Sequence, residues 1–229
     1  MIEMISMRRV LFKSVMAAAG SCALAFAGYA QAQMPVRAGQ EYTIVERPQA
    51  TTSGKKVEVL EFFGYFCPAC NAFEPHFEEW IKKQGDRIVV KRVHTDIHDF
   101  VTQQKLFFAL EAMGKSEELQ SRVFAAYHVE RNRLMTDADV MKFIDKSGVD
   151  KKKFTDIYNS FTVMTKVKAV PRMQEAFRIN SVPSVVIDGR FLVSPMDVAS
   201  KNRQLGGSIH PGILVMDALV EKVVKEKNP

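Results

Sequence analysis

Cysteine and tryptophan are scarce in this chain, with 3 cysteines and 1 tryptophan among 229 residues. This scarcity excludes the small folds that depend on a framework of disulfides. The 12 glycines and 9 prolines are also too few for a collagen-like or low-complexity chain. The sequence is instead that of an ordinary globular protein, because 47% of its residues are hydrophobic and its length allows a proper buried core.

A strong excess of one charge is absent as well. Lysine and arginine number 32 against 26 acidic residues, which gives a net charge of +6. The first 32 residues hold Arg8, Arg9 and Lys13 against Glu3, so the remaining chain carries about +4. Nucleic-acid-binding domains are typically more basic than this, and we therefore expect no nucleic-acid partner.

The N-terminus has the pattern of a secretory signal peptide. The basic residues precede an apolar stretch from Val15 to Tyr29, and the small-residue site Ala30-Gln31-Ala32 follows. The alternative is an uncleaved anchor helix, but the apolar stretch is shorter than the ~20 residues that a bilayer span needs. We expect cleavage after Ala32, and a mature chain in an exported compartment with no later segment that could span a membrane.

Removal of residues 1–32 leaves two cysteines, both in the motif Cys67-Pro68-Ala69-Cys70. A disulfide between them closes too small a loop to stabilise the fold much, so the pair is more typical of chemistry than of structure. Half of a zinc site and an accidental pair are the alternatives. Zinc takes four ligands, and no second C-x-x-C or H-x3-5-H motif accompanies this one, so we predict a redox site and no metal site.

The motif follows a predicted strand and opens a predicted helix. The run Val57-Glu58-Val59-Leu60-Glu61-Phe62-Phe63 is β-branched and aromatic, and Gly64 ends it. Pro68 suits the first turn of a helix, where its missing N–H is no loss. Cys67 then lies at the helix N-terminus, where unpaired N–H groups and the helix dipole favour a thiolate. We expect Cys67 to be the exchanging thiol and Cys70, one turn further, to be its resolving partner.

The rest of the chain changes from mixed to helical character and back. A second strand at 88–93 follows the helix and should run parallel to the first, because the two form a βαβ unit. Start and stop signals of helices then fill the region from about residue 99 to 178. The later predicted elements are strands at 184–187 and 190–193, joined by the turn pair Asp188-Gly189, and a helix from about Pro211.

Two segments resemble the DsbA family of periplasmic thiol:disulfide oxidoreductases. They are Phe62-Phe63-Gly64-Tyr65-Phe66-Cys67-Pro68-Ala69-Cys70 and the run from Ser181-Val182-Pro183-Ser184 to Val185-Val186-Ile187-Asp188-Gly189-Arg190. The resemblance covers essentially the whole mature chain. It implies an α/β protein, a thioredoxin fold with an inserted all-helical domain. The predicted boundaries are 1–32 for the signal peptide, 33–98 and 174–229 for the thioredoxin-fold domain, and 99–173 for the helical insertion.

The resemblance also implies roles for residues and partners. Val182 and Pro183 match the family's cis-proline loop, which lends backbone groups to an extended substrate; from the sequence alone, a trans proline that opens a strand is the alternative. The implied partners are reduced or partly folded exported proteins and a DsbB-like membrane protein that regenerates the disulfide. We expect a periplasmic monomer without a cofactor.

Glu61 and Lys91 are charges within otherwise apolar strand runs, and each would be costly to bury alone. The resemblance places a buried acid and a lysine beneath the active site as proton acceptors for Cys70. We therefore predict a buried pair of Glu61 and Lys91 across two parallel strands. The alternative is that each side chain points to solvent at a strand end.

Ala69 departs from the pattern of the family, whose best-known members carry histidine before the second cysteine. The two central residues, Pro68 and Ala69, help to set how strongly the Cys67 thiolate is stabilised. This departure bears on oxidising strength and leaves the chemistry intact.

The sequence thus predicts a thiol:disulfide oxidoreductase that donates its Cys67–Cys70 disulfide to newly exported proteins. A reductase or isomerase of the same fold is one alternative, although residues 33–53 leave no room for the separate dimerisation domain that such isomerases usually carry. A metal-binding C-x-x-C module is the alternative from a different class.

Overall fold

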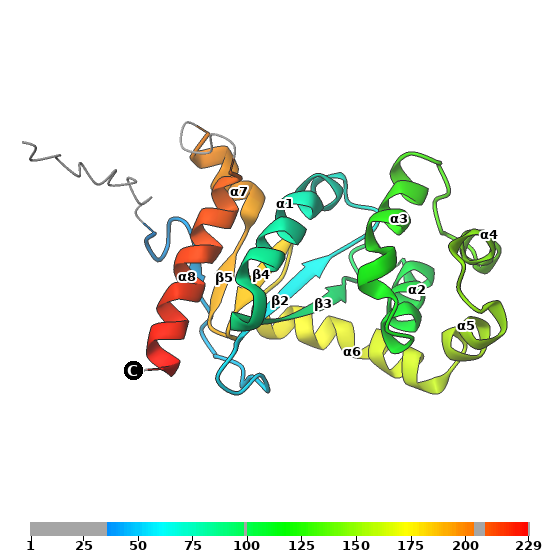
Figure 1. The fold of residues 1–229 in the computed structure, drawn as a ribbon, viewed down its shortest axis with the longest axis horizontal. Helices are drawn as coiled ribbons and strands as arrows, with labels where there is room; N and C mark the ends of the chain where they lie inside the picture. Colours follow the sequence, from blue (N-terminus) through cyan, green and yellow to red (C-terminus); the bar gives the residue numbers. More distant parts are fainter. Residues whose placement is uncertain (1–35, 99, 204–208, 229) are drawn as a thin grey trace, which may run out of the picture. The chain divides into compact units, whose positions relative to one another are not determined.

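The described part of the chain, residues 36–98, 100–203 and 209–228 of a computed structural model, is built on a five-stranded sheet (Figure 1). The predicted signal peptide lies outside these residues. The strand order is β1-β5-β4-β2-β3. The strands are β1 Thr43–Ile44, β2 Val57–Phe63, β3 Ile88–His94, β4 Ser184–Ile187 and β5 Phe191–Val193.

The β2 and β3 strands pair in parallel, which confirms the βαβ unit predicted from the sequence. The β4 strand runs antiparallel to both β2 and β5. The hairpin between β4 and β5 has three connecting residues, because the N–H of Arg190 donates to the carbonyl of Ile187 at 3.0 Å. The β5 strand therefore begins at Phe191, one residue later than predicted.

Helices α1, Pro68–Gln84, and α8, Pro211–Lys227, cover one face of the sheet (Figure 1). Their apolar side chains pack with Val57 and Val59 of β2 in one core cluster, which includes Phe77 and Leu219. Burying a large apolar side chain of this kind stabilises the fold by ~1.5–3 kcal/mol. The strand β1 and the helix α7, Pro195–Lys201, were not predicted from the sequence.

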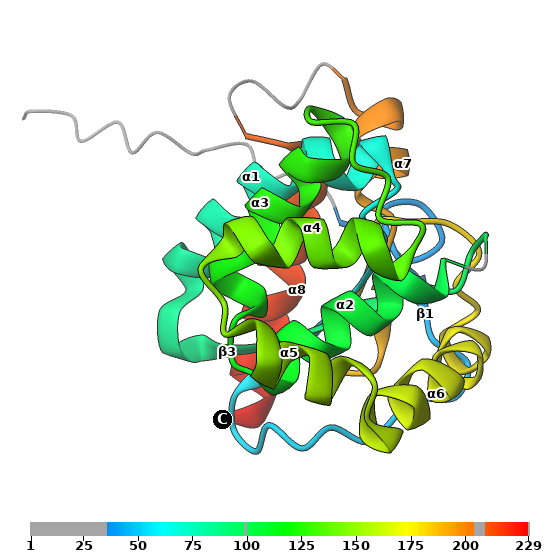
Figure 2. The ribbon, with the colours of Figure 1, turned by 90° about the vertical axis from the view of Figure 1, so that its right-hand side faces the viewer.

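The predicted helical region forms the insertion and packs at one end of the sheet (Figure 1), and its helices face the viewer in Figure 2. Thr136 and Asp139 form the capping box that starts α4. Along the other face of the sheet, Phe177 of α6 packs on Phe62 of β2 with ring centroids 5.8 Å apart. The helices are α2 Val101–Ala112, α3 Ser116–His128, α4 Asp137–Ser147, α5 Lys151–Tyr158 and α6 Phe161–Phe177, and a short 3-10 turn, η1 Gly85–Arg87, precedes β3.

Three buried glutamines join the insertion to the end of the sheet. The side-chain amide of Gln104 donates to the carbonyl of His94 at 3.2 Å, and Gln120 accepts from the hydroxyl of Tyr65 at 3.0 Å. Gln174 accepts from the N–H of Asp96 at 2.9 Å. Each bond satisfies a polar group that would otherwise be buried alone, at a cost of ~1–3 kcal/mol.

Across the described ranges, none of the helices has the length and apolar character needed to cross a membrane.

Candidate active site

Cys67 and Cys70 lie at the start of α1, which follows β2 in the chain. Cys67 immediately precedes the helix and Pro68 occupies its first position, as predicted. The N–H of Cys70 donates to the Sγ of Cys67 at 3.1 Å, so this sulfur caps the helix N-terminus. Cys67 is 6% exposed and Cys70 is 1% exposed, and both are free thiols. Cys67 is therefore the more accessible of the two cysteines to a substrate thiol.

The pKa values of the two thiols are shifted in opposite directions. A hydrogen bond with the Cys70 side chain lowers the pKa of Cys67 below its ordinary value; burial opposes this, and the N–H groups of Cys70 and Ala69 lower the pKa further. Burial raises the pKa of Cys70 far above its ordinary value, and the hydrogen bond with Cys67 adds to the rise. Cys67 is thus suited to react as a thiolate, whereas Cys70 must lose a proton to an acceptor before it can react.

The loop before β4 lies against the reactive sulfur. The Val182–Pro183 peptide bond is cis, and the thiol of Cys67 donates to the carbonyl of Val182 at 3.4 Å. The structure thus brings together Cys67 and the two residues predicted to bind substrate, although they are more than a hundred positions apart in the sequence. Their role in substrate binding stays a prediction.

Glu61 is buried beneath the cysteines, but its partner is Arg92 and not Lys91. The Nε of Arg92 donates to Oε2 of Glu61 at 2.9 Å, with the two side chains 2% and 1% exposed. Lys91 points from the opposite face of β3, is 43% exposed, and pairs with Glu58 at 2.7 Å. The predicted buried pair of Glu61 and Lys91 is therefore wrong. The cause is the strand register, which sets Glu61 beside Arg92, because a shift of one residue moves a side chain to the other face.

Four carboxyl groups from three elements surround the guanidinium of Arg92. Besides Glu61, Glu74 and Glu78 of α1 contact its Nη2 at 3.2 and 2.7 Å, and Glu117 of α3 contacts its Nη1 at 3.2 Å. The exposed fraction of these side chains rises from 4% for Glu74 to 27% for Glu78 and 63% for Glu117. We call these five residues the Arg92 cluster. It leads from the buried active site to the surface.

Protons are held inside this cluster at neutral pH. Burial raises the pKa of Glu61 to about 7, although the charge and the hydrogen bond of Arg92 pull it down. Burial also raises the pKa of Glu74 to about 9, and repulsion from Glu61 contributes to the rise. Arginine itself does not titrate in proteins, so any proton exchanged here belongs to a carboxyl group.

A backbone hydrogen bond and a glycine position the segment that leads to Cys67. The N–H of Tyr65 donates to Nε2 of His94 at 3.1 Å, and burial lowers the pKa of His94 to about 4, so its ring is neutral and can accept. A side chain on Gly64 would place its Cβ 2.3 Å from the ring of Phe66. Glycine at this position therefore lets the aromatic ring lie beside the motif.

A partly exposed aromatic group borders the cysteine motif. The ring of Phe66 packs at 4.9 Å from Phe100 and at 5.3 Å from His98, measured between centroids. These two partners were not predicted from the sequence, because they lie after the end of β3, outside any regular element. The Arg92 cluster beyond Glu61 was also missed, since each of its members looks like an ordinary surface charge in the sequence.

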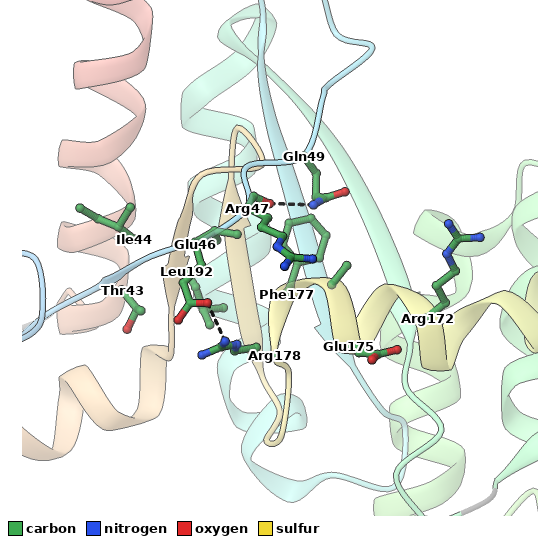
Figure 3. A pocket seen from close by; sticks show the side chains of 12 residues that line it. Thr43, Ile44, Glu46, Arg47, Gln49, Arg172, Glu175, Phe177, Arg178 and Leu192 are labelled. Atoms are coloured by element: carbon green, nitrogen blue, oxygen red, sulfur yellow. Dashed lines mark hydrogen bonds and ion pairs between the residues drawn. The ribbon is translucent and has the colours of Figure 1, made fainter.

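Two cavities lie away from the cysteine motif, and neither Cys67 nor Cys70 lines them. A cavity of about 520 Å³ lies between residues 43–49 and the end of α6, and Arg47 and Phe177 are among the residues that line it (Figure 3). A neighbouring cavity of about 330 Å³ includes Lys91 in its lining. Within the described part of the chain, no three His, Cys, Asp or Glu residues gather in a group that could hold a metal ion.

The fold and the site together define a thioredoxin-fold protein with a dithiol active site and a helical insertion. The family model of the DSBA-like thioredoxin domain matches residues 58–202, and the chain belongs to this family. The predicted fold class is thereby confirmed. The domain boundaries stay a prediction.

Relatives and solved structures agree with this assignment. A protein of Burkholderia cepacia named thiol:disulfide interchange protein DsbA is 40% identical over 204 residues, which cover 88% of this chain and 92% of the relative. A DsbA of Pseudomonas aeruginosa is 30% identical over 191 residues, covering 81% of this chain and 84% of the relative. The crystal structure of Pseudomonas aeruginosa DsbA matches with a TM-score of 0.73 at 27% identity and covers 84% of this chain and 97% of that one.

Proposed function

We propose that this thiol:disulfide oxidoreductase works as an oxidase, which donates the Cys67–Cys70 disulfide to newly exported proteins. The single observation that carries the proposal is the unequal setting of the two sulfurs. The Cys67 sulfur accepts an N–H at the start of α1, the loop at Val182 lies against it, and its pKa is lowered, whereas Cys70 is more deeply buried and its pKa is raised. A thiolate with a low pKa is a good leaving group, which favours the reduced form of the pair and makes the disulfide an oxidant.

The exchange proceeds in two steps. A substrate thiolate attacks Cys67, the bond between Cys67 and Cys70 breaks, and the electron pair goes to Cys70, which takes up a proton. A second substrate thiolate then attacks the substrate sulfur of this mixed disulfide and releases Cys67 as a thiolate. The substrate has lost two electrons and gained a disulfide, and the protein has become a dithiol.

Glu61 supplies the proton that Cys70 takes up in the first step and accepts it when the disulfide is restored. Its carboxyl group is buried beside Arg92, and a pKa of about 7 lets it act in either direction near neutral pH. Val182 and Pro183 hold an extended stretch of substrate across Cys67 with backbone groups, since the Val182 carbonyl already lies 3.4 Å from the sulfur. Pro68 and Ala69 tune the thiolate of Cys67.

The setting of this activity is the periplasm. The predicted signal peptide directs export, and a DsbB-like membrane protein restores the disulfide after each cycle. The family's relatives are named for thiol:disulfide interchange, which favours an oxidoreductase over a metal-binding module. Cell fractionation with N-terminal sequencing tests the location: a mature chain that starts at Gln33 in the periplasmic fraction is expected.

The oxidase activity is tested with a reduced, unfolded model enzyme that regains activity only when its disulfides form. The oxidised mature protein should restore that activity with one disulfide formed per protein molecule, and Cys67→Ser should restore none. Equilibration with glutathione gives the direction independently. A couple as reducing as that of thioredoxin, about −270 mV, would contradict the oxidase role and favour the reductase alternative.

A further inference from the structure

The exchange reaction needs a proton at a place that water does not reach directly. Cys70 is 1% exposed, and so is the side chain of Glu61, the acceptor proposed for it. A buried carboxyl group that takes one proton per cycle must pass it on before the next cycle begins. The question is therefore which group connects Glu61 to solvent.

Arg92 contacts the carboxyl groups that could connect Glu61 to solvent. Its Nη2 lies 3.2 Å from Oε1 of Glu74 and 2.7 Å from Oε1 of Glu78, so these two carboxyl groups of α1 are held on the same nitrogen. Glu74 is buried, and among the described residues neither of its carboxyl oxygens has a hydrogen-bond partner, so its contact with Arg92 is an ion pair only. Glu78 is 27% exposed and stands one turn closer to the surface.

We propose that Glu78 is the proton outlet of the active site: the proton exchanged with the Cys70 thiol reaches solvent through the carboxyl groups of Glu61, Glu74 and Glu78, which Arg92 holds together. The inference rests on the proton-accepting role proposed for Glu61. Arg92 acts as a positioning residue, because its guanidinium keeps its own protons and only fixes the carboxyl groups.

The charges that face this route come from every element packed around it. They are Glu61 on β2, Arg92 on β3, Glu74 and Glu78 on α1, and Glu117 on α3. One positive charge faces four carboxyl groups, so at least one of the buried acids holds a proton at neutral pH. The raised pKa of Glu74, about 9, agrees with a proton resting between Glu61 and Glu78.

Glu117 provides a matched control within the same cluster. It is more exposed than Glu78 and bonds to the same guanidinium, but through Nη1, on the side away from Glu74. Glu78→Gln and Glu117→Gln each remove one carboxylate from Arg92, and only the first interrupts the proposed route. Glu79→Gln, at an exposed residue of α1 that pairs with Lys83, serves as the neutral reference.

The experiment measures how fast Cys70 resolves the mixed disulfide between Cys67 and glutathione. In this step Cys70 loses its proton, its sulfur bonds to Cys67, and the glutathione thiolate leaves with the electron pair. Reduced protein is mixed rapidly with glutathione disulfide at neutral pH and low buffer concentration, and the release of glutathione is followed. Because this assay needs no protein substrate, it is readable even if the oxidase role fails.

We expect Glu78→Gln to resolve the mixed disulfide about 10-fold more slowly than the natural protein, and added formate to restore most of the rate by carrying the proton. Glu117→Gln and Glu79→Gln should show no response to formate. An unchanged rate in Glu78→Gln, or a slow rate that formate does not restore, would overturn the outlet. Unfolding curves of all variants show whether a slow rate comes from a damaged fold.

The Glu61→Gln variant distinguishes a failure of the Glu78 outlet from a failure of the proton-accepting role proposed for Glu61. A slow Glu61→Gln variant together with a normal Glu78→Gln variant overturns the outlet alone. A normal rate in Glu61→Gln overturns the role of Glu61 itself, and the outlet with it.

Discussion

The N–H of Cys70 donates to the sulfur of Cys67 at 3.1 Å, although the two cysteines face opposite electrostatic settings. The same short loop therefore stabilises one thiolate and buries the other thiol. Because the two sulfurs differ in this way, replacing Cys67 by serine should have a different effect from replacing Cys70.

Cys67→Ser should abolish the oxidation of protein thiols, because no sulfur remains at the helix N-terminus to receive the substrate. Cys70→Ser should accumulate mixed disulfides between Cys67 and substrate, because no thiol is left to resolve them. Non-reducing gels of each variant after incubation with disulfide-linked substrate distinguish the two. Mixed disulfides trapped in Cys67→Ser instead would reverse the assignment.

Ala69→His should make the protein a stronger oxidant. A protonated histidine next to Cys67 would add charge stabilisation to its thiolate, which alanine cannot, and ~1.4 kcal/mol corresponds to about 30 mV for a two-electron couple. We expect a lower pKa of Cys67, read from thiolate absorbance against pH, and a potential raised by some tens of millivolts on this scale. Ala69→Ser is the control for side-chain size. If neither pKa nor potential moves, other contacts of Cys67, such as the Val182 carbonyl, set the oxidising strength.

Glu61→Gln should slow the resolution step by about 100-fold and remove its pH dependence near neutrality. In the natural protein only the carboxylate form accepts the proton of Cys70, so the rate should rise as the pH increases through the pKa of Glu61, about 7. Stopped-flow measurements across this range give the profile for both proteins. A profile that keeps its step near neutrality in the variant would assign that step to another group.

Glu74→Gln should flatten the fall in stability as the pH rises. The pKa of Glu74 is about 9 in the folded protein and near its ordinary value when unfolded, so the folded state holds the additional proton between these limits. The free energy of unfolding should therefore decrease with rising pH in this window, by at most ~1.4 kcal/mol per pH unit for one proton. Urea titrations of both proteins at several pH values test this, and equal slopes would contradict it.

Arg92→Met and Lys91→Met should differ although the residues are neighbours in the sequence. Removing Arg92 leaves Glu61 buried without its partner, a change that typically costs ~3–5 kcal/mol. Lys91 makes a half-exposed pair with Glu58, and such pairs contribute ~0–1 kcal/mol. Denaturation midpoints compare the two variants directly. Equal losses of stability would mean that the strand register does not determine which cation supports the active site.

The error over Lys91 shows which information a single sequence withholds. The run 88–93 identified a strand beside β2, and its parallel direction followed from the βαβ unit. Neither fact fixes how far one strand slides along the other, and a slide of one residue exchanges the two faces. The structure aligns Val57 with Ile88, and this alignment alone brings Arg92 to Glu61 and turns Lys91 away.

Local signals predicted the cysteine motif well because its chemistry depends on neighbours in the chain. A strand, a glycine and a proline were enough to place Cys67 at a helix end. The contact of Cys67 with Val182 joins distant segments, and it was reached through family resemblance and not through pattern.

The buried glutamines had a signal that could have been used. Gln120 falls three and four residues before Val123 and Phe124, and Gln174 falls four after Val170 and three before Phe177, so both lie on the apolar faces of their helices. A polar residue at such a position indicates a buried hydrogen bond. The partners, Tyr65 and Asp96, follow the ends of β2 and β3 and are far from these glutamines in the chain, so the sequence alone does not identify them.

The three glutamine bonds between the insertion and the sheet join uncharged groups only. Amides, hydroxyls and backbone carbonyls of this kind neither gain nor lose protons in the physiological range, and dissolved ions screen them little. These hydrogen bonds therefore persist through changes of pH and ionic strength that weaken the ion pair of Glu117 with Arg92, which also joins the insertion to the sheet. The bond of Gln120 to Tyr65, two residues before Cys67, therefore keeps the surroundings of the reactive sulfur constant while pH and ionic strength change.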